Sequence, residues 1–271
     1  MGGQSLLATE LKQTQAPRLT VYILSFNEAR QIRAVLESVK WADEIILVDS
    51  FSTDGTVEIA REYGARILSE KFNGFGKLRN VALDAASHDW VLSIDADERC
   101  TAELAAEVRC ELDRGPAFDA YHVPRKSHFL GKWMRHCGWY PDYRQPQFFH
   151  RRKFRYNEEL VHESYRLNGS LGHLKEHALQ YPWNTIETAV AKMQRYSTLM
   201  AERYAASGKR ASLTKLLLSP CAMFAKVYLF QQGFRDGRHG FLLAAIYGYY
   251  TFLKYAKLWE LQARAAEKAA G

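Results

Sequence analysis

Residues 19–95 alternate between short apolar runs and segments whose apolar side chains recur at helical spacing. The connections between these segments are short, and alternation of this kind places parallel strands in one sheet with helices on its faces. We therefore predict an α/β fold with a mostly parallel, twisted sheet flanked by helices. The expected strands are 19–25, 44–50, 65–70 and 90–98, and the expected helices contain 32–39, 56–59, 77–86 and 104–112.

The pattern changes after Gly115 and Pro116. Residues 117–180 are rich in aromatic, histidine and arginine side chains and have no helical periodicity, which is typical of a binding region attached to a scaffold. Helical spacing returns afterwards and continues into an apolar, aromatic tail. We divide the chain into a disordered leader (1–17), an α/β half (18–115), an irregular region (116–182) and a C-terminal helical region (183–271).

The tail is apolar enough to raise the question of a membrane. Its longest uncharged run lies between Arg238 and Lys254 and has 15 residues, whereas a spanning helix needs about 20. Aromatic side chains flanked by Lys and Arg favour helices that lie at a membrane surface. Helices that simply pack on the domain remain an alternative, and a transmembrane hairpin is less favoured. The first residues carry no secretory signal, so we expect a cytoplasmic protein that is peripheral on a membrane.

The charge of the chain is concentrated in one stretch. Hydrophobic residues make up 47% and charged residues 25%, which excludes a disordered chain, a fibre and a membrane protein with many spans. The formal net charge is +7, and residues 124–155 hold nine Lys or Arg against Asp142 as the one acid. An anionic partner is therefore expected there. The four cysteines form no C-x-x-C pair, which favours reduced thiols.

Polar residues stand at the ends of the expected strands. Asn27 and Glu28 follow the first strand, Asp49 ends the second, and Asp95 and Asp97 end the fourth. Ligands of parallel sheets bind at these carboxyl ends. No glycine-rich dinucleotide or P-loop motif accompanies them, so a nicotinamide enzyme or a P-loop enzyme is disfavoured.

Asp95 and Asp97 suggest a metal site. In an extended strand, residues i and i+2 point to the same side, so we expect both carboxylates in one cavity. Mg²⁺ or Mn²⁺ typically combines one or two carboxylates with phosphate oxygens, although a helix-capping role is an alternative. Lys77 and Arg79 could meet the phosphates or be solvated helix charges.

Four blocks together resemble a known family. SFNEA (25–29), DSFSTDGT (49–56), the K-x-R-N-x-A of 77–82 and DADE (95–98) occur in this order in the inverting family 2 glycosyltransferases of the GT-A fold. The GWYPD block (138–142), His162-Glu163 and GFRDGRHGF (233–241) resemble the branch that includes the lipopolysaccharide core β-glucosyltransferases.

The resemblance implies a metal-dependent transfer of a sugar from a UDP-sugar to the lipopolysaccharide inner core. Glucose is the sugar that the resemblance favours. The end of the first strand and Asp49 would hold the uridine, Asp95 would lie near the ribose, and Asp97 would bind Mg²⁺ or Mn²⁺ on the diphosphate. The residues expected to hold the donor are Ser25, Asn27, Glu28, Asp49, Lys77, Arg79 and Asp95. The resemblance thus makes 18–115 the donor-binding half and 116–182 the acceptor and catalytic-base region of an enzyme on the cytoplasmic face of the inner membrane.

An inverting transfer also needs a general base on the acceptor side. We expect Glu163, because the flanking LVHES sequence suggests partial burial, which would raise its pKa, and His162 could orient it. Asp142 is the second candidate, and Glu158 and Glu159 lie in a more charged loop.

The basic stretch 124–155 would bind an anionic lipid-linked saccharide, with arginine on its phosphates and Phe129, Trp133, Trp139, Tyr140 or Tyr143 stacked on sugar rings. A solvated basic face is an alternative, and nucleic acid is disfavoured because no nucleic-acid motif is present. Two other functions stay open: transfer to a polyprenyl-phosphate or another surface polysaccharide, and silent binding of a nucleotide sugar or carbohydrate.

Overall fold

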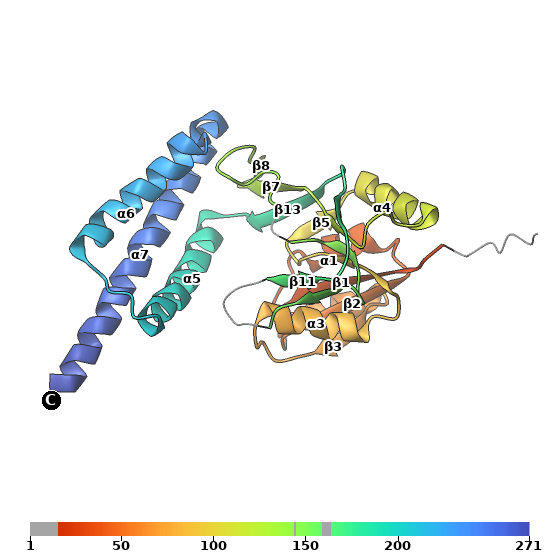
Figure 1. Ribbon diagram of the computed structural model, residues 1–271, viewed down its shortest axis with the longest axis horizontal. Coiled ribbons are helices and arrows are strands. Elements are labelled where there is room, and N and C mark those ends of the chain that lie inside the picture. The colour runs from red at the N-terminus through yellow and green to blue at the C-terminus, as the bar shows by residue number, and fades with distance from the viewer. Residues whose placement is uncertain (1–15, 144, 159–163, 271) are drawn as a thin grey trace, which may run out of the picture.

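The computed structural model describes residues 16–143, 145–158 and 164–270, and Figure 1 shows how its elements are arranged. The first part of the chain forms an α/β body, and the last part forms a group of long helices. A small second sheet lies between them (Figure 1). The expected leader falls almost entirely outside the described residues.

The main sheet has seven strands and is mostly parallel, as the sequence predicts. Strand β1 is fully buried and pairs in parallel with both β2 and β4, so the centre of the sheet is the apolar part. Strand β9 is antiparallel to β4 and β6, and it joins residues after 116 to the same sheet. The order is β12 (Leu171–His173), β6 (Ala120–His122), β9 (Phe148–His150), β4 (Trp90–Ser93), β1 (Leu19–Ser25), β2 (Glu44–Asp49) and β3 (Arg66–Ser69).

Helices cover both faces of this sheet. The apolar sides of α1 (Ile32–Val39) and α4 (Ala102–Arg114) join one core cluster, and that of α3 (Phe75–Ala85) joins the other. The Thr101 hydroxyl accepts a 3.1 Å hydrogen bond from the Leu104 nitrogen, so Thr101 caps α4 as its sequence indicates. The remaining elements of this body are helix α2 (Thr56–Glu62) and the hairpin of β10 (Phe154–Tyr156) and β11 (Tyr165–Leu167).

The expectation of one strand over 90–98 is wrong. Strand β4 ends at Ser93, and Asp95-Ala96-Asp97 forms a turn closed by the Glu98 nitrogen, which donates to the Asp95 carbonyl oxygen at 2.9 Å. The chain then enters a second sheet, because Gln180 pairs with Glu98. This sheet has the order β5 (Glu98–Cys100), β13 (Ala178–Trp183), β7 (Arg125–Phe129) and β8 (Lys132–Trp133).

The C-terminal helices attach to the second sheet through a third core cluster. Phe129 and Trp183 from this sheet pack in it with Met193, Leu243 and Ile246 from the helices. Helix α7 lies between α5 and α6 (Figure 1). Helix α5 begins three residues later than the sequence indicated, since Trp183 still belongs to β13. The elements are α5 (Ile186–Ala206), α6 (Leu213–Ala225), a π-helical turn η1 (Lys226–Phe230), a 3₁₀ turn η2 (Gly233–Asp236) and α7 (Gly237–Ala270).

Candidate active site

The loop after β2 is built around Asp49, which is buried. Its carboxylate accepts hydrogen bonds from the Ser25 hydroxyl at 2.8 Å and from the Ser52 nitrogen at 2.8 Å. The carboxylate thus fixes the ends of β1 and β2 side by side. The sequence prediction that Ser25 and Asp49 belong to one site agrees with this placement, while their contact with a nucleotide stays a prediction.

Asn27 and Glu28 lie in the loop after β1 and are tied to the loop after β2. The Asn27 side-chain oxygen accepts from the Thr53 nitrogen at 2.9 Å, and the Glu28 nitrogen donates to the Thr56 hydroxyl at 2.8 Å. Burial and the negative charge of Asp97 raise the pKa of Glu28. Glu28 and the Asp95–Asp97 turn therefore face the same space.

Exposed phenylalanines surround this edge, and the sequence reasoning missed them. Phe26 follows β1, Phe51 follows β2, and Phe72 and Phe75 form an edge-to-face pair between β3 and α3, with ring centroids 5.0 Å apart. Large apolar side chains next to turns at the carboxyl ends of strands are the signal that could have found them. They offer flat surfaces on which a base or sugar can stack.

The buried side chain of Arg79 forms an ion pair with Asp95. The Arg79 guanidinium is buried, and it donates to the Ser93 hydroxyl and to the Asp95 carboxylate, each at 2.9 Å. Asp95 itself is about one-third exposed. Arg79 therefore orients a carboxylate that still reaches the open edge, whereas Lys77 is exposed on the same helix. Phosphate contacts of Lys77 and Arg79 stay predictions.

Asp97 lies in a crowded, acidic position. Burial and the charge of Asp95 raise its pKa, while the positive charge of Lys192 and a hydrogen bond from Gln180 oppose this effect. Lys192 belongs to α5, 95 positions further along the chain, and its charge also lowers the pKa of Glu28. No sequence motif marks this lysine. It is a half-buried cation whose charge acts on the acidic turn.

The residues present fit a divalent cation. Two carboxylates that disfavour each other's charge are relieved by a cation between them, and carboxylate oxygens suit Mg²⁺ and Mn²⁺. Within the described residues, no group of three or more His, Cys, Asp or Glu side chains is arranged to hold a metal. Asp95 and Asp97 would thus need oxygens from a bound diphosphate to complete the coordination.

A buried network lies behind the acidic turn. Glu98 is fully buried and accepts from Arg125 at 2.9 Å, from the Gln147 amide at 2.9 Å and from the Asp95 nitrogen at 3.0 Å. Burial raises the pKa of Glu98 above its ordinary value, although Arg125 opposes the shift. Arg125 also lies 3.5 Å from the Asp142 carboxylate and donates to its carbonyl oxygen. The structure thus joins Asp142, Arg125 and Glu98 to Asp95.

The K-x-R-N block has a second role, which is to hold the chain before the expected base. Asn80 is buried, and its side chain bonds both the nitrogen and the oxygen of Tyr156 and the Glu158 carboxylate. At Gly76 an added Cβ would lie 2.0 Å from the Asn157 oxygen, so the chain crosses α3 in direct contact. Glu159, His162 and Glu163 lie outside the described residues, and their roles stay predictions.

The basic, aromatic stretch divides into two parts. Trp133 lies under the cations of Lys126 and Arg135, at 5.2 and 4.5 Å, and contacts the ring of Tyr140. Three other arginines, Arg151, Arg152 and Arg155, instead pair with Asp89 or Asp84 beside the main sheet.

The inclusion of Phe129 and Trp139 among the sugar-stacking residues is wrong. Both are buried in the core that joins the second sheet to the C-terminal helices. Tyr140 and Tyr143 are exposed, and Trp133 is half-buried. Of the residues predicted to stack on sugar rings, Trp133, Tyr140 and Tyr143 are therefore the ones whose side chains reach the surface.

A mostly parallel sheet with an acidic turn at its carboxyl edge and a second, smaller sheet beside it defines a GT-A glycosyltransferase fold. The chain belongs to the glycosyl transferase family 2, whose sequence model matches residues 20–168.

The chain is also similar to one curated relative and two solved structures, as follows. LpsC of Rhizobium meliloti (strain 1021), a lipopolysaccharide core biosynthesis glycosyltransferase, is 29% identical over 256 residues, covering 90% of this chain and 93% of LpsC. Residues 1–349 of TarS from S. aureus align with a TM-score of 0.48, at 17% identity and 92% coverage of each chain. Glucosyl-3-phosphoglycerate synthase from Mycobacterium tuberculosis, solved with Mn²⁺, UDP and glucosyl-3-phosphoglycerate, gives a TM-score of 0.39 at 23% identity, covering 50% of this chain and 57% of that one.

Proposed function

We propose that this family 2 glycosyltransferase moves glucose, with inversion, from UDP-glucose to a lipopolysaccharide inner-core acceptor. The observation that carries the proposal is the similarity to LpsC, which extends over 90% of this chain and includes the C-terminal helices as well as the donor region. We infer that the enzyme works as a peripheral protein on the cytoplasmic face of the inner membrane, where a lipid-anchored acceptor is exposed.

In this proposal the loops after β1 and β2 bind the nucleoside. Asp49 fixes both loops, Asn27 and Glu28 line the space beside them, and the exposed Phe26 and Phe51 offer stacking surfaces for uracil. The ribose lies at Asp95, which Arg79 orients.

Asp97 and Asp95 would hold Mg²⁺ or Mn²⁺, and that cation would neutralise the charge that develops on the departing diphosphate. The chain contributes its own cation on the same side. Lys192 faces Asp97 and Glu28 from α5, which suits a contact with a donor phosphate.

The general base removes the proton of the acceptor hydroxyl as that oxygen attacks the anomeric carbon from the side opposite UDP. We propose Glu163 for this role. Support comes from the segment that precedes Glu163 in the sequence, since Asn80 and Gly76 hold residues 156–158 against α3 at the donor edge. Asp142 is the second candidate. Its largely buried carboxylate lies beside Arg125, which favours a role in holding the loop over a role in reaching an acceptor.

The acceptor would be anionic and saccharide-like. Lys126 and Arg135 suit its phosphates or carboxylates, and Trp133, Tyr140 and Tyr143 suit its sugar faces.

The decisive experiment incubates the full-length protein with a panel of radiolabelled UDP-sugars and membranes from a core-truncated strain. We expect label from UDP-glucose in lipopolysaccharide, and no transfer by an Asp97→Ala variant. The matched control is Asp113→Asn, which alters an exposed acid on α4. Label in a polyprenyl-phosphate lipid, or transfer from another UDP-sugar only, would replace the acceptor or the donor proposed here, and intact binding without transfer would indicate a silent protein.

A further inference from the structure

Helix α6 has one side packed on α7 and one side with no protein partner among the described residues. None of its residues is buried, and Leu217 and Leu218 are 57% and 62% exposed. The apolar surface continues through η1, where Phe230 is 82% exposed, to Phe234. We call residues 213–234 the tail surface. Within the part of the chain that the structure describes, one helical stretch, 213–230, has the length and composition to cross a membrane.

The apolar run that stood out in the sequence, between Arg238 and Lys254, is a different segment. It belongs to α7, where Leu243, Ala244 and Ile246 are buried in the core shared with the second sheet. One side of that run therefore faces protein, while Phe241 and Leu242 on another side are exposed and add to the apolar area of α6 and η1.

The charges within and next to the tail surface along the chain are almost all positive. Residues 209–238 contain six Lys or Arg and one acid, Asp236. Asp236 is buried, and its carboxylate accepts from the His136 nitrogen at 2.8 Å, so it does not offset these cations at the surface. An apolar area with a cationic border matches the boundary between acyl chains and anionic headgroups in a lipid leaflet.

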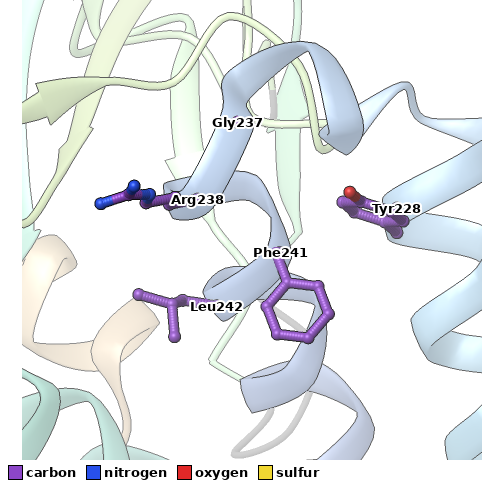
Figure 2. A pocket seen from close by; sticks show the side chains of 5 residues that line it. All are labelled: Tyr228, Gly237, Arg238, Phe241 and Leu242. Atoms are coloured by element: carbon purple, nitrogen blue, oxygen red, sulfur yellow. The ribbon is translucent and has the colours of Figure 1, made fainter.

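A cleft of about 390 Å³ opens at one end of the tail surface. Figure 2 shows Phe241 between Tyr228 of η1 on one side and Arg238 and Leu242 of α7 on the other. The Arg238 guanidinium has no ion pair or hydrogen bond among the described residues, whereas the other lining groups are mainly apolar. This combination suits a lipid phosphate at Arg238 with an acyl chain against Phe241.

The packing of α6 on α7 does not suit a spanning helix. The eighteen residues of 213–230 reach about 27 Å at 1.5 Å each, which is near the lower limit for crossing a hydrocarbon core of about 30 Å. Helix α7 packs along α6, and it carries Lys254, Lys257 and Glu260, which would have to enter the hydrocarbon with it.

We propose that the tail surface and the Arg238 cleft bind the headgroup–acyl boundary of an anionic phospholipid bilayer, with α6 lying in the plane of one leaflet. This inference rests on the proposed peripheral association and names the surface that performs it. Leu217 and Leu218 insert among the acyl chains, and Lys215, Lys226 and Arg238 contact phosphates.

The test is flotation of the full-length protein with phosphatidylcholine vesicles that contain roughly a third phosphatidylglycerol. We expect the wild type to float with these vesicles at low salt and to float less with phosphatidylcholine alone. The double variant Leu217→Glu/Leu218→Glu should bind at least about tenfold more weakly, because two apolar side chains no longer leave water. Arg238→Gln should weaken binding to the anionic vesicles only.

The matched control is Leu199→Glu, which changes an equally exposed leucine on α5 and should float like the wild type. Calorimetric binding of UDP by the double variant should equal that of the wild type, which shows that the fold survives. This readout uses no acceptor, so an error in the proposed sugar or acceptor would leave the flotation result intact.

Four outcomes would overturn the inference. The first is a double variant that floats as well as the wild type, and the second is a wild type that floats with neither kind of vesicle. The third is a lipid-free dimer that sedimentation detects and that Leu217→Glu/Leu218→Glu dissociates, which would assign the surface to a second copy. The fourth is resistance to extraction at alkaline pH, which would indicate a spanning segment.

Discussion

The carboxylate of Asp236 accepts a 2.8 Å hydrogen bond from the backbone nitrogen of His136, which precedes it by 100 positions. The backbone oxygen of Asp236 accepts a second bond, from the Lys132 ammonium at 2.6 Å. The GFRDGRHGF segment thus fastens the C-terminal helices to the loop that leads to Tyr140 and Asp142. This clasp joins the tail surface to the loop that carries Tyr140 and Asp142.

Replacing Asp236 by alanine should loosen the clasp. The His136 nitrogen and the neighbouring buried groups lose their acceptor, which costs about 1–3 kcal/mol in the free energy of unfolding. Urea denaturation measures this loss, with Asp113→Ala as the exposed control. We also expect a higher KM for the acceptor and an unchanged KM for the UDP-sugar, and a rise in both would contradict a role confined to the acceptor loop.

The Asp97→Ala variant should lose metal-dependent binding of UDP while it keeps the fold. Burial and the charge of Asp95 disfavour the charged form of Asp97, and a cation bound there would relieve this effect. Calorimetry with UDP in the presence and absence of Mn²⁺ measures the effect. An unchanged affinity with Mn²⁺ would refute the metal role of Asp97.

The Glu163→Gln variant tests the general base. The amide keeps the size and hydrogen bonding of the carboxylate but cannot accept the acceptor's proton, so turnover should fall by about 10²- to 10⁴-fold. Binding of the UDP-sugar should survive. Activity within about threefold of the wild type would be too small a loss for a general base and would move the assignment to Asp142, through Asp142→Asn.

Lys192 should matter for the donor. Removing its charge in Lys192→Met should raise the KM for the UDP-sugar by roughly tenfold, the value of one charge-assisted contact, and Lys192→Arg should restore most of the affinity. Arg195→Met removes another cation from α5 and is the matched control. Equal effects of Lys192→Met and Arg195→Met would indicate a general loss of positive charge.

The sequence predicts the α/β body well, because each central strand is a continuous apolar run and Thr101 carries a recognisable cap. It misplaces the end of the fourth strand. Ile94 continues the apolar pattern, and nothing local indicates that Glu98 pairs with Gln180, which is far away in the sequence. The prediction that Trp139 stacks on a sugar ring is wrong for a related reason, because its burial depends on the distant helix α7. Its indole nitrogen donates to the Tyr247 hydroxyl of that helix at 3.0 Å.

The sequence predicts some residues of the candidate site and not others. The spacing along the chain identifies residues at the carboxyl ends of strands, and Ser25, Asp49 and Asp95 lie at one edge of the sheet. Lys192 and Arg125 reach this edge from α5 and from the second sheet. Such contacts depend on tertiary packing, so local periodicity cannot reveal them.

The crossing of the chain over Gly76 has a consequence for how substitutions are tolerated. Any side chain at this position must displace the Asn157 carbonyl oxygen, 2.0 Å from where its Cβ would stand, and with it the strand that Asn80 anchors. A saturation-mutagenesis map would rank position 76 beside the acidic residues, although a glycine offers no reactive group. Substitutions at position 76 would fail because the backbone of residues 156–158 lies directly against α3 and leaves no room for a side chain. A related enzyme with a larger residue at this position should therefore have a 156–158 segment that lies further from α3.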